Sequence, residues 1–397
     1  MAALPRQLPL VLPLGDGYPP EALAQAIGSP PQAGLLPSIP FGWQGSSLPV
    51  AASQLEAVIS NLLGSLHEDG FEKVLLAAPA GIRLNLDAEC LALRHPEASP
   101  ATPRGSEPCR GSGKGQALPT DRPADEMFTP GLDPAKVVLI PIGHTEQHGY
   151  HLALSTDTVI IAAISQGAAA AAPELALSLP VTPYGVSTHR RAFAGTFNAG
   201  GRAFEDFWLG VIDQLASRGV EMVYLMSGHG GSCSFLTNVV KYAGEQHPEM
   251  FCATAWLYLS GPQGTAALER YRRSPRGGMG HACELETALM LHLRPDLVHM
   301  ARVVDEMDTI TTPSYTMDWV EGGTLVANPP WEDETTTGAY GAGSLATPET
   351  GKLWLEAAVA EKVGHIHEII EQHTRRCARR QSRGNKAGFL TLQEKLA

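Results

Sequence analysis

The stretch KVVLIPIGHTEQHGYHLALSTD, residues 136–157, changes from apolar to polar at Gly143. Its first part, 136–142, is a short and continuously apolar run that is typical of a buried strand. The second part gathers histidines and carboxylates directly after that strand and ends in Ser155-Thr156-Asp157, which favours the start of a helix. Polar residues at the carboxyl end of a buried strand commonly form functional sites. The stretch therefore predicts a strand, a functional loop and a helix.

The chain around this stretch alternates between strand-like and helix-like segments. The strand-like runs are continuously apolar, which indicates strands that are buried on both faces. This order predicts an α/β fold with a mainly parallel sheet covered by helices on both faces. The predicted strands are 136–142, 175–181, 220–227 and 251–258, and the predicted helices are 156–172, 204–218, 284–293 and 352–376.

The composition changes sharply between two parts of the chain. Residues 94–130 are rich in Pro, Gly, Ser and charge and contain few aliphatic residues, so we expect them to form a linker. They separate an N-terminal segment, 1–93, from a predicted catalytic domain, 131–376. Residues 377–397 carry repeated Arg and Lys and are predicted to be a basic tail, either a solvated one or a binding arm.

The N-terminal segment resembles a truncated copy of the catalytic domain. Three pairs of matching segments occur in the same order: VLPLG 11–15 with LIPIG 139–143, LPSIPFG 36–42 with LPVTPYG 179–185, and Gly70 plus strand 73–78 with Gly219 plus strand 222–227. Chance similarity between two β-α segments is the alternative, and the preserved order favours duplication.

The polar residues of the catalytic domain are missing from that copy. Tyr18, Pro20 and Ala80 stand where the second copy has Glu146, His148 and His229. We therefore expect 1–93 to be a degenerate unit without metal ligands. It would pack against the catalytic domain, replace a neighbouring subunit, or form a loosely attached appendage.

The overall composition restricts the classes of function. A formal net charge of −12 argues against nucleic acid or an anionic membrane as partner. No run of about 18 apolar residues predicts a membrane span. The six cysteines show no CxxC spacing, which argues against a zinc knuckle and favours a reducing, cytoplasmic location.

The loop 143–157 contains the densest set of candidate metal ligands. Glu146 and His148 are two residues apart, so both can point the same way from an extended loop, and Asp157 follows at the start of a helix. Carboxylate and imidazole groups suit divalent zinc or manganese. By itself Asp157 would be read as a helix cap.

Two further clusters follow later in the chain. The sequence SGHGGS, 227–232, comes after a predicted strand and presents His229 among glycines; a phosphate-binding loop is the alternative, but the Lys-Ser/Thr of that motif is absent. The sequence GHACELETALML, 280–291, places His281, Glu284 and Glu286 at a helix start. Only one of the two glutamates can face the same site, because residues two apart do not share a helical face.

Together these three motifs resemble the signatures of the creatininase (creatinine amidohydrolase) family: a Glu-x-His loop with a downstream Asp, a Gly-His-Gly-Gly loop, and a His-Ala-x-x-x-Glu-Thr helix start. The resemblance covers about residues 136 to 300. It implies an α/β sandwich, a metal centre that hydrolyses C–N amide bonds, and a homo-oligomer, often a hexamer. Carried over by position, it implies that Glu146, His148, Asp157 and His229 are metal ligands, with Asp157 as the bridge.

One position departs from the family pattern. Creatininase has a further metal-binding Glu two residues after the equivalent of His229, where this chain has Gly231. Glu286 is our candidate to replace it, with Glu284 in reserve. We expect one or two divalent ions per chain, with Zn²⁺ preferred and Mn²⁺ or Fe²⁺ also suitable.

The predicted activity is metal-dependent hydrolysis of an amide in a small, cyclic or formamide-type substrate. His281 and Glu284 are the predicted catalytic residues, with His281 as proton donor to the departing nitrogen. Tyr184, His189 and Thr196 are predicted to contact substrate. Creatinine itself is disfavoured, because the substrate-contacting tryptophans of creatininase are not recognisable near Cys283. Alternatives are a modified peptide, a cyclic ketone, or a non-catalytic assembly scaffold.

Overall fold

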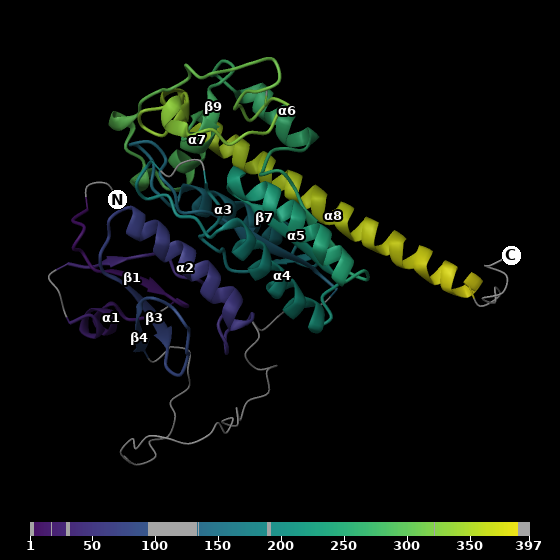
Figure 1. The fold of residues 1–397 in the computed structure, drawn as a ribbon. Helices are drawn as coiled ribbons and strands as arrows, with labels where there is room; N and C mark the ends of the chain where they lie inside the picture. The colour runs from purple at the N-terminus through teal and green to yellow at the C-terminus, as the bar shows by residue number, and fades with distance from the viewer. Residues whose placement is uncertain are drawn as a thin grey trace, which may run out of the picture.

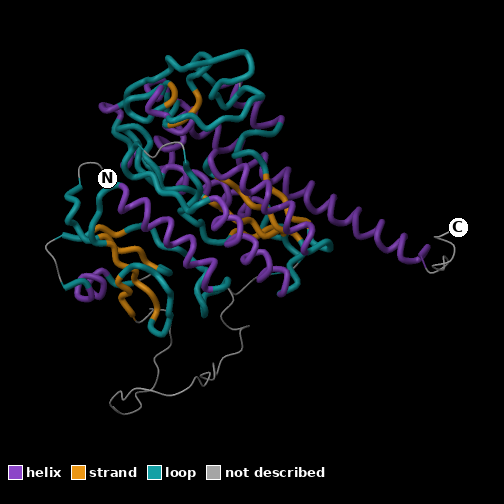
Figure 2. The backbone as a smooth tube through the Cα atoms, in the orientation of Figure 1, coloured by secondary structure: helices purple, strands orange, loops and turns teal. Residues whose placement is uncertain are grey.

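The computed structural model describes residues 4–16, 18–28, 32–93, 133, 135–188, 192–320 and 322–387. Two four-stranded parallel sheets lie on either side of a shared helical layer (Figure 1). Figure 2 shows the strands of these two sheets as separate groups, with helices between and beyond them. The predicted linker, 94–130, lies outside the described residues. The predicted α/β class with parallel sheets and flanking helices is confirmed.

The N-terminal segment forms the first sheet, in the order β2-β1-β3-β4 with all neighbours parallel. Its strands are β1 (Leu10–Pro13), β2 (Gly34–Leu35), β3 (Val74–Pro79) and β4 (Glu89–Leu93), and its helices are α1 (Pro20–Ala26) and α2 (Ala52–Glu68). Side chains of α2 pack on one face of the sheet, and Leu23 of α1 packs on the other. The segment therefore buries both faces of its sheet.

The catalytic domain forms the second sheet, in the order β6-β5-β7-β8 and again parallel throughout. Its strands are β5 (Val137–Ile142), β6 (Ala176–Ser178), β7 (Met222–Ser227) and β8 (Phe251–Thr254). Its helices are α3 (Thr156–Ala171), α4 (Gly201–Ser217), α5 (Cys233–Gln246), α6 (Pro262–Tyr271), α7 (Glu284–Leu293) and α8 (Pro348–Ala387). A short antiparallel pair, β9 (Met279–His281) and β10 (Tyr340–Gly341), precedes and follows α7. All predicted strands and helices of this domain are present, whereas α5, α6 and this pair were not predicted.

The central strand β5 divides its side chains between two cores. Val138, Ile140 and Ile142 join the core that contains α2 and α4, while Val137 and Leu139 join the core that contains α3, α7 and α8. This alternation follows from the two-residue repeat of a strand. Because both faces are covered, the strand is apolar throughout, as its sequence indicated.

The two sheets repeat the same backbone contacts. Gly15 N donates to Ile39 O at 2.8 Å, and Gly143 N donates to Thr182 O at 2.8 Å. Farther along the chain, the amide of Val50 donates to Gly42 O at 3.0 Å and that of Ala199 to Gly185 O at 2.9 Å. These matches support the proposal that 1–93 is a copy of the catalytic unit; a common origin remains a prediction.

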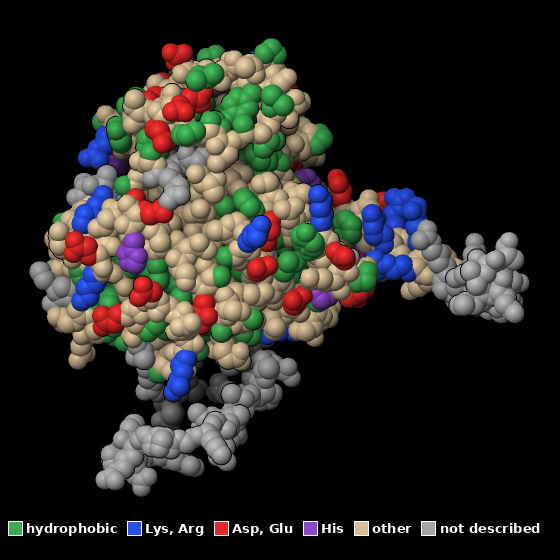
Figure 3. Space-filling view, in the orientation of Figure 1, with side chains coloured by type: hydrophobic (Ala, Val, Ile, Leu, Met, Phe, Trp, Pro, Cys, Tyr) green, Lys and Arg blue, Asp and Glu red, His purple; other side chains and the backbone are tan. Residues whose placement is uncertain are grey.

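Helix α8 continues beyond the predicted end of the catalytic domain. The predicted tail, 377–397, begins inside this helix, and the tail beyond Ala387 lies outside the described residues. Arg375 pairs with Glu371 one turn earlier in the same helix, and Arg380 Nη1 donates to Glu249 O, in the loop between α5 and β8, at 3.2 Å. Figure 3 shows Lys and Arg gathered where α8 extends from the body. Among the described helices, none has the length and apolar character needed to cross a membrane.

Candidate metal centre

The loop after β5 is held tightly against the start of α3. A Cβ on Gly143 would lie 2.5 Å from Thr158 Cα, so only glycine permits this approach. The Glu146 amide donates to Leu154 O at 3.1 Å and closes the loop. Glu146, His148 and Asp157 are thereby brought together, and all three side chains are buried. The first predicted cluster thus lies at the carboxyl end of β5, as expected for a parallel sheet.

The second and third clusters reach the same place from other loops. His229 follows β7, and a Cβ on the preceding Gly228 would lie 2.6 Å from Asp157 O. His281 ends β9, and Glu286 lies in the first turn of α7. Both are also buried. Segments that are more than fifty residues apart therefore meet in one cluster.

The carboxylates and imidazoles of this cluster lie at short distances. Glu146 Oε1 is 3.0 Å from His229 Nδ1, and the two oxygens of Asp157 reach His148 Nε2 at 3.1 Å and His229 Nδ1 at 3.3 Å. Longer distances of 3.7 Å and 3.9 Å separate His281 Nδ1 from Glu146 and Glu286. Asp157, facing two histidines with different oxygens, has the arrangement of a bridging carboxylate.

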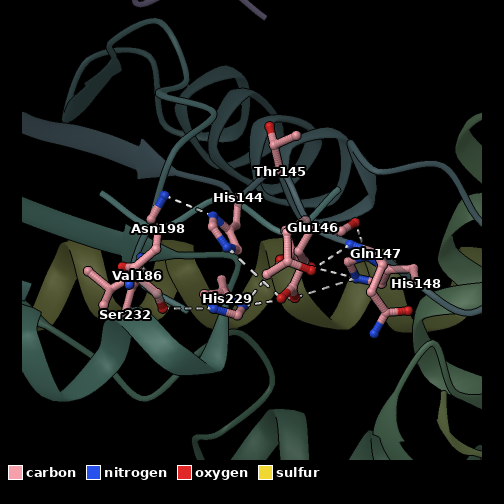
Figure 4. Close-up of polar contacts among 12 residues, drawn as sticks. His144, Thr145, Glu146, Gln147, His148, Val186, Asn198, His229 and Ser232 are labelled. Atoms are coloured by element: carbon pink, nitrogen blue, oxygen red, sulfur yellow. Dashed lines mark hydrogen bonds and ion pairs between the residues drawn. The ribbon is translucent and has the colours of Figure 1, made fainter. Parts of the chain in front are cut away.

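Three histidines are oriented by backbone carbonyls. His148 Nδ1 contacts Glu146 O at 3.1 Å, His229 Nε2 contacts Val186 O at 3.0 Å, and His281 Nε2 contacts Gln147 O at 2.8 Å. A carbonyl can only accept, so each of these nitrogens donates its proton. The other ring nitrogen of each histidine faces the carboxylates, and Figure 4 shows this for His148 and His229. This orientation, with one nitrogen held by a backbone carbonyl and the other directed into the cluster, is typical of metal-binding histidines.

The electrostatics of the cluster also fit a cation. Burial alone would lower the pKa of His148, but Asp157 and the two glutamates outweigh burial and raise it to about 9. The same balance, with Glu146 as the largest favourable contribution, raises the pKa of His229 to about 9. Protons on these rings would neutralise the carboxylates, and a divalent cation bound by all of them would do the same. The donor set therefore fits one or two divalent ions.

His144 is also buried in the cluster and was missed in the sequence analysis. Its Nδ1 accepts a hydrogen bond from Gly185 N at 2.9 Å, the reverse of the other three histidines. A neutral ring then carries its proton on Nε2, which faces Glu146 Oε2 at 4.0 Å. This disfavours His144 as a ligand. It lies two residues before Glu146, so the alternation that paired Glu146 with His148 could have identified it.

Gly231, the departure from the family pattern, cannot carry a side chain in this conformation. A Cβ there would lie 2.3 Å from Val186 O and 2.5 Å from His229 Nε2, the two atoms of the bond that orients His229. Glu286 approaches the cluster from α7 instead, with Oε1 3.9 Å from His148 Nε2. Its other oxygen is fixed by the amide of Ala282 at 2.5 Å. This location agrees with the proposal that Glu286 replaces the missing ligand.

Glu284 points away from the cluster. Its carboxylate accepts backbone hydrogen bonds from Arg273 N at 3.0 Å and Ser274 N at 2.7 Å. Since Glu286 faces the cluster, a residue two positions earlier on the same helix must face elsewhere. The expectation of a catalytic role or a reserve ligand at Glu284 is therefore corrected: its carboxylate anchors the loop after α6.

The predicted substrate contacts have different locations. Tyr184 is buried in the core between the two sheets, where its hydroxyl donates to Pro37 O at 2.6 Å, so it serves packing and not a substrate pocket. Thr196 Oγ1 accepts from Gln147 N at 3.3 Å and thus contacts the loop of Glu146. His189 lies outside the described residues.

Tyr258 is a further polar residue that the sequence analysis did not select. Its side chain is buried, and its hydroxyl has no hydrogen-bond partner among the described residues. Burial raises the pKa of this hydroxyl, and the nearby charges of Glu286 and Asp157 raise it further. The charges of the cluster therefore affect the pKa of the Tyr258 hydroxyl.

Comparison with known proteins agrees with this geometry. The chain is 28% identical over 248 residues to creatinine amidohydrolase of Pseudomonas putida, covering 58% of this chain and 89% of that protein. It is 32% identical over 167 residues to the mycofactocin precursor peptide peptidase of Mycolicibacterium smegmatis, covering 40% and 59% of the two chains. A solved mutant creatininase complexed with creatine shares the fold, with a TM-score of 0.50 and 24% identity over 60% of this chain and 93% of that one.

Residues 126–366 match the creatininase family, described as creatinine amidohydrolase. This match covers most of the chain, including every residue of the cluster. The resemblance inferred from the three motifs is thus confirmed. The chain belongs to the creatininase family of metal-dependent amidohydrolases.

Proposed function

We propose that this protein hydrolyses a C–N amide bond in a small substrate with the help of one or two divalent ions, Zn²⁺ being preferred over Mn²⁺ or Fe²⁺. The observation that carries the proposal is the orientation of His148, His229 and His281: a backbone carbonyl holds one ring nitrogen of each, and the other nitrogen faces buried carboxylates. A divalent cation at such a site supplies Lewis-acid activation of water and of a carbonyl.

The histidines of the cluster divide into two groups by distance. His148 and His229 lie 3.0–3.3 Å from their nearest carboxylate oxygens, and we assign them as ligands together with the three carboxylates, Glu146, Asp157 and Glu286. His281 lies farther out, at 3.7 Å and 3.9 Å. We assign His281 as the proton carrier, because a departing amide nitrogen must gain a proton and an imidazole can provide one near neutral pH.

A comparison of two histidine variants tests this assignment. We expect His281→Ala to retain its metal but to lose about a hundredfold or more of its amide hydrolysis. His292, an exposed histidine of helix α7, which follows His281 in the chain, provides the control, and His292→Ala should retain both properties. Metal content would be measured by mass spectrometry and hydrolysis with a panel of cyclic amides and formamides. Loss of metal from His281→Ala would make His281 a ligand, and full activity in thoroughly chelated protein would contradict the proposed mechanism.

A peptide amide is a second candidate substrate. The identity of 32% to a peptidase of a precursor peptide favours it, although the match spans only 59% of that protein. Short peptides in the same panel would distinguish the two classes: cleavage of peptides but not of small amides would replace the first proposal. A cyclic ketone remains a further alternative from the sequence.

Assembly and location are also proposals. We propose a homo-oligomer, with a hexamer as the expected form, in the cytoplasm. Light scattering on the purified full-length chain would measure the assembly size, and a single-chain mass would contradict the proposed oligomer. Fractionation of cells that express the chain would test its location.

A further inference from the structure

The N-terminal segment and the catalytic domain meet through equivalent helices. Helices α2 and α4 run antiparallel, because Ser65 near the end of α2 contacts Asn198 just before α4, and Arg218 just after α4 contacts Ser47 just before α2. Asp69 immediately follows α2 as Arg218 follows α4. Its carboxylate accepts a hydrogen bond from Gly195 N at 2.6 Å, whereas Arg218 Nη1 donates to Ser47 O at 3.0 Å. The two ends of this interface thus have reciprocal contacts.

Only one of these reciprocal contacts leads to the metal centre. Asp69 binds Gly195, and the Ser65 hydroxyl accepts from Asn198 N at 3.1 Å. Residues 195–198, which we call the strap, are therefore held at both ends by α2 and the residue that follows it. Gly195 has a φ of 95°, a backbone conformation that favours glycine.

The middle of the strap holds the backbone on both sides of Glu146. Phe197 N donates to Thr145 O at 3.1 Å, and Thr196 Oγ1 accepts from Gln147 N at 3.3 Å. Gln147 O in turn accepts the hydrogen bond that orients His281. A displacement of the strap would thus change the positions of Glu146 and His281 together. Figure 4 shows Asn198 of the strap beside His144.

We propose that Asp69 and Ser65 of the N-terminal segment are positioning residues of the metal centre, and that this segment acts as a built-in partner unit that fixes the strap. The inference rests on the proposed function, since it concerns the same cluster. Asp69 suits the role because a carboxylate makes a stronger hydrogen bond to an amide than a neutral oxygen does. The Gly195 contact is also partly buried, which limits competition by water.

Arg218 provides the matched control. Its contact with Ser47 lies at the other end of the same interface and leads to the N-terminal segment, which has none of the proposed ligands. Removal of the Asp69 or the Arg218 side chain should weaken the interface between the units. Only the removal of Asp69 should change the position of Glu146, because Asp69 holds the strap. A purely structural role for Asp69 predicts equal effects of the two substitutions on the metal centre.

The experiment compares three single variants of the full-length chain, Asp69→Ala, Ser65→Ala and Arg218→Ala, with the wild type. Zn²⁺ affinity would be measured by competition with a chromophoric chelator, and hydrogen exchange would be measured for residues 144–148 and 195–198. We expect Asp69→Ala to weaken Zn²⁺ binding about tenfold, as is usual for loss of a residue that supports ligands, and to raise exchange in both segments. Ser65→Ala should act in the same direction more weakly. Asp69→Asn retains an acceptor oxygen and should recover most of the affinity.

Two results would overturn the inference. One is unchanged Zn²⁺ affinity and exchange in Asp69→Ala; the other is an equal loss in Arg218→Ala. If Asp69→Ala does not fold, Ser65→Ala gives the same comparison with Arg218→Ala, with smaller changes. Failure of the wild-type chain to bind Zn²⁺ would count against the proposed function, while the exchange measurement would still decide whether Asp69 and Ser65 hold the loop.

Discussion

The first and second sheets have the same strand order but differ at the carboxyl end of their central strand. After β5, Glu146 lies in a cluster of carboxylates and histidines. After β1, Tyr18 stands at the equivalent position, and its hydroxyl donates back to Leu14 O at 3.0 Å. The strands are apolar in both sheets, so the fold depends on residues that the two units share. The chemistry depends on a few loop residues that they do not share.

The largest effect that this comparison predicts is that of Glu146→Gln. Glu146 Oε1 faces His148, His229 and His281, so its charge contributes to the whole cluster. Loss of a supporting residue commonly costs 10- to about 100-fold in metal affinity, and we expect loss of a ligand to cost more than about a hundredfold. Excess Zn²⁺ should then no longer raise the unfolding temperature of the variant as it does for the wild type. Equal stabilisation of both proteins by Zn²⁺ would contradict a metal centre at Glu146.

The second prediction is that metal binding depends on pH, because of two histidines that belong to the catalytic domain. The pKa values of His148 and His229 are raised to about 9 in the metal-free protein, so both rings are protonated at neutral pH. A cation must displace these protons, and its affinity should therefore increase with pH by about ten- to a hundredfold per unit until about pH 9. In the metal-free protein the free energy of unfolding that these histidines contribute changes with pH in the opposite direction. The stabilisation from the bound protons is complete below the unfolded pKa of 6.5 and is lost as the pH rises through about 9.

Two kinds of calorimetry would measure the two parts of the pH prediction: scanning calorimetry of the metal-free protein would measure its stability, and Zn²⁺ titrations would measure the affinity. Zn²⁺ titrations in buffers with different ionisation heats give the number of protons released, which we expect to be between about one and two at pH 7. An affinity that is constant between about pH 6 and 8 would show that neither ring loses a proton when the ion binds.

The third prediction uses a glycine that the N-terminal unit does not have. Ile82 stands where the catalytic domain has Gly231, and a Cβ at Gly231 would collide with the bond between His229 and Val186 O. Gly231→Ala should therefore turn the His229 ring and weaken Zn²⁺ binding about tenfold. Gly230→Ala is the control, because the nearest side-chain atoms around a Cβ there lie at 3.9 Å. Similar affinities in the two variants would show that the orientation of His229 does not depend on this close approach.

The sequence predicted most of the fold because the decisive residues follow local rules. The continuous apolar run 137–142 identified β5, and Arg294-Pro295 identified the end of α7. Helix α5 was missed because it begins at Cys233, directly after the SGHGGS motif, which was read as a loop. The end of α8 was missed because its arginines find partners one turn earlier or on another segment, such as Glu249.

The candidate site was predicted less completely, for reasons of orientation. Residue type and spacing identified His229, but they did not reveal which ring nitrogen of His144 accepts a hydrogen bond, because its donor Gly185 is distant in sequence. They also placed Tyr184 in a pocket, although its hydroxyl contacts Pro37 of the other unit. Contacts between units depend on how the sheets pack, and one sequence contains no local signal for that.

The smallest predicted effect is that of Tyr18→Phe at the degenerate position. Removal of the hydroxyl loses one buried hydrogen bond to Leu14 O, which should lower the free energy of unfolding by about 1 kcal/mol. Zn²⁺ affinity should not change, because Tyr18 lies at the carboxyl end of the other sheet. Chemical denaturation with and without Zn²⁺ would measure both quantities in the same samples. A change in metal affinity comparable to that of Gly231→Ala would mean that the N-terminal unit takes part in ion binding itself. The two sheets would then differ in how strongly each contributes to ion binding, and not in whether each contributes at all.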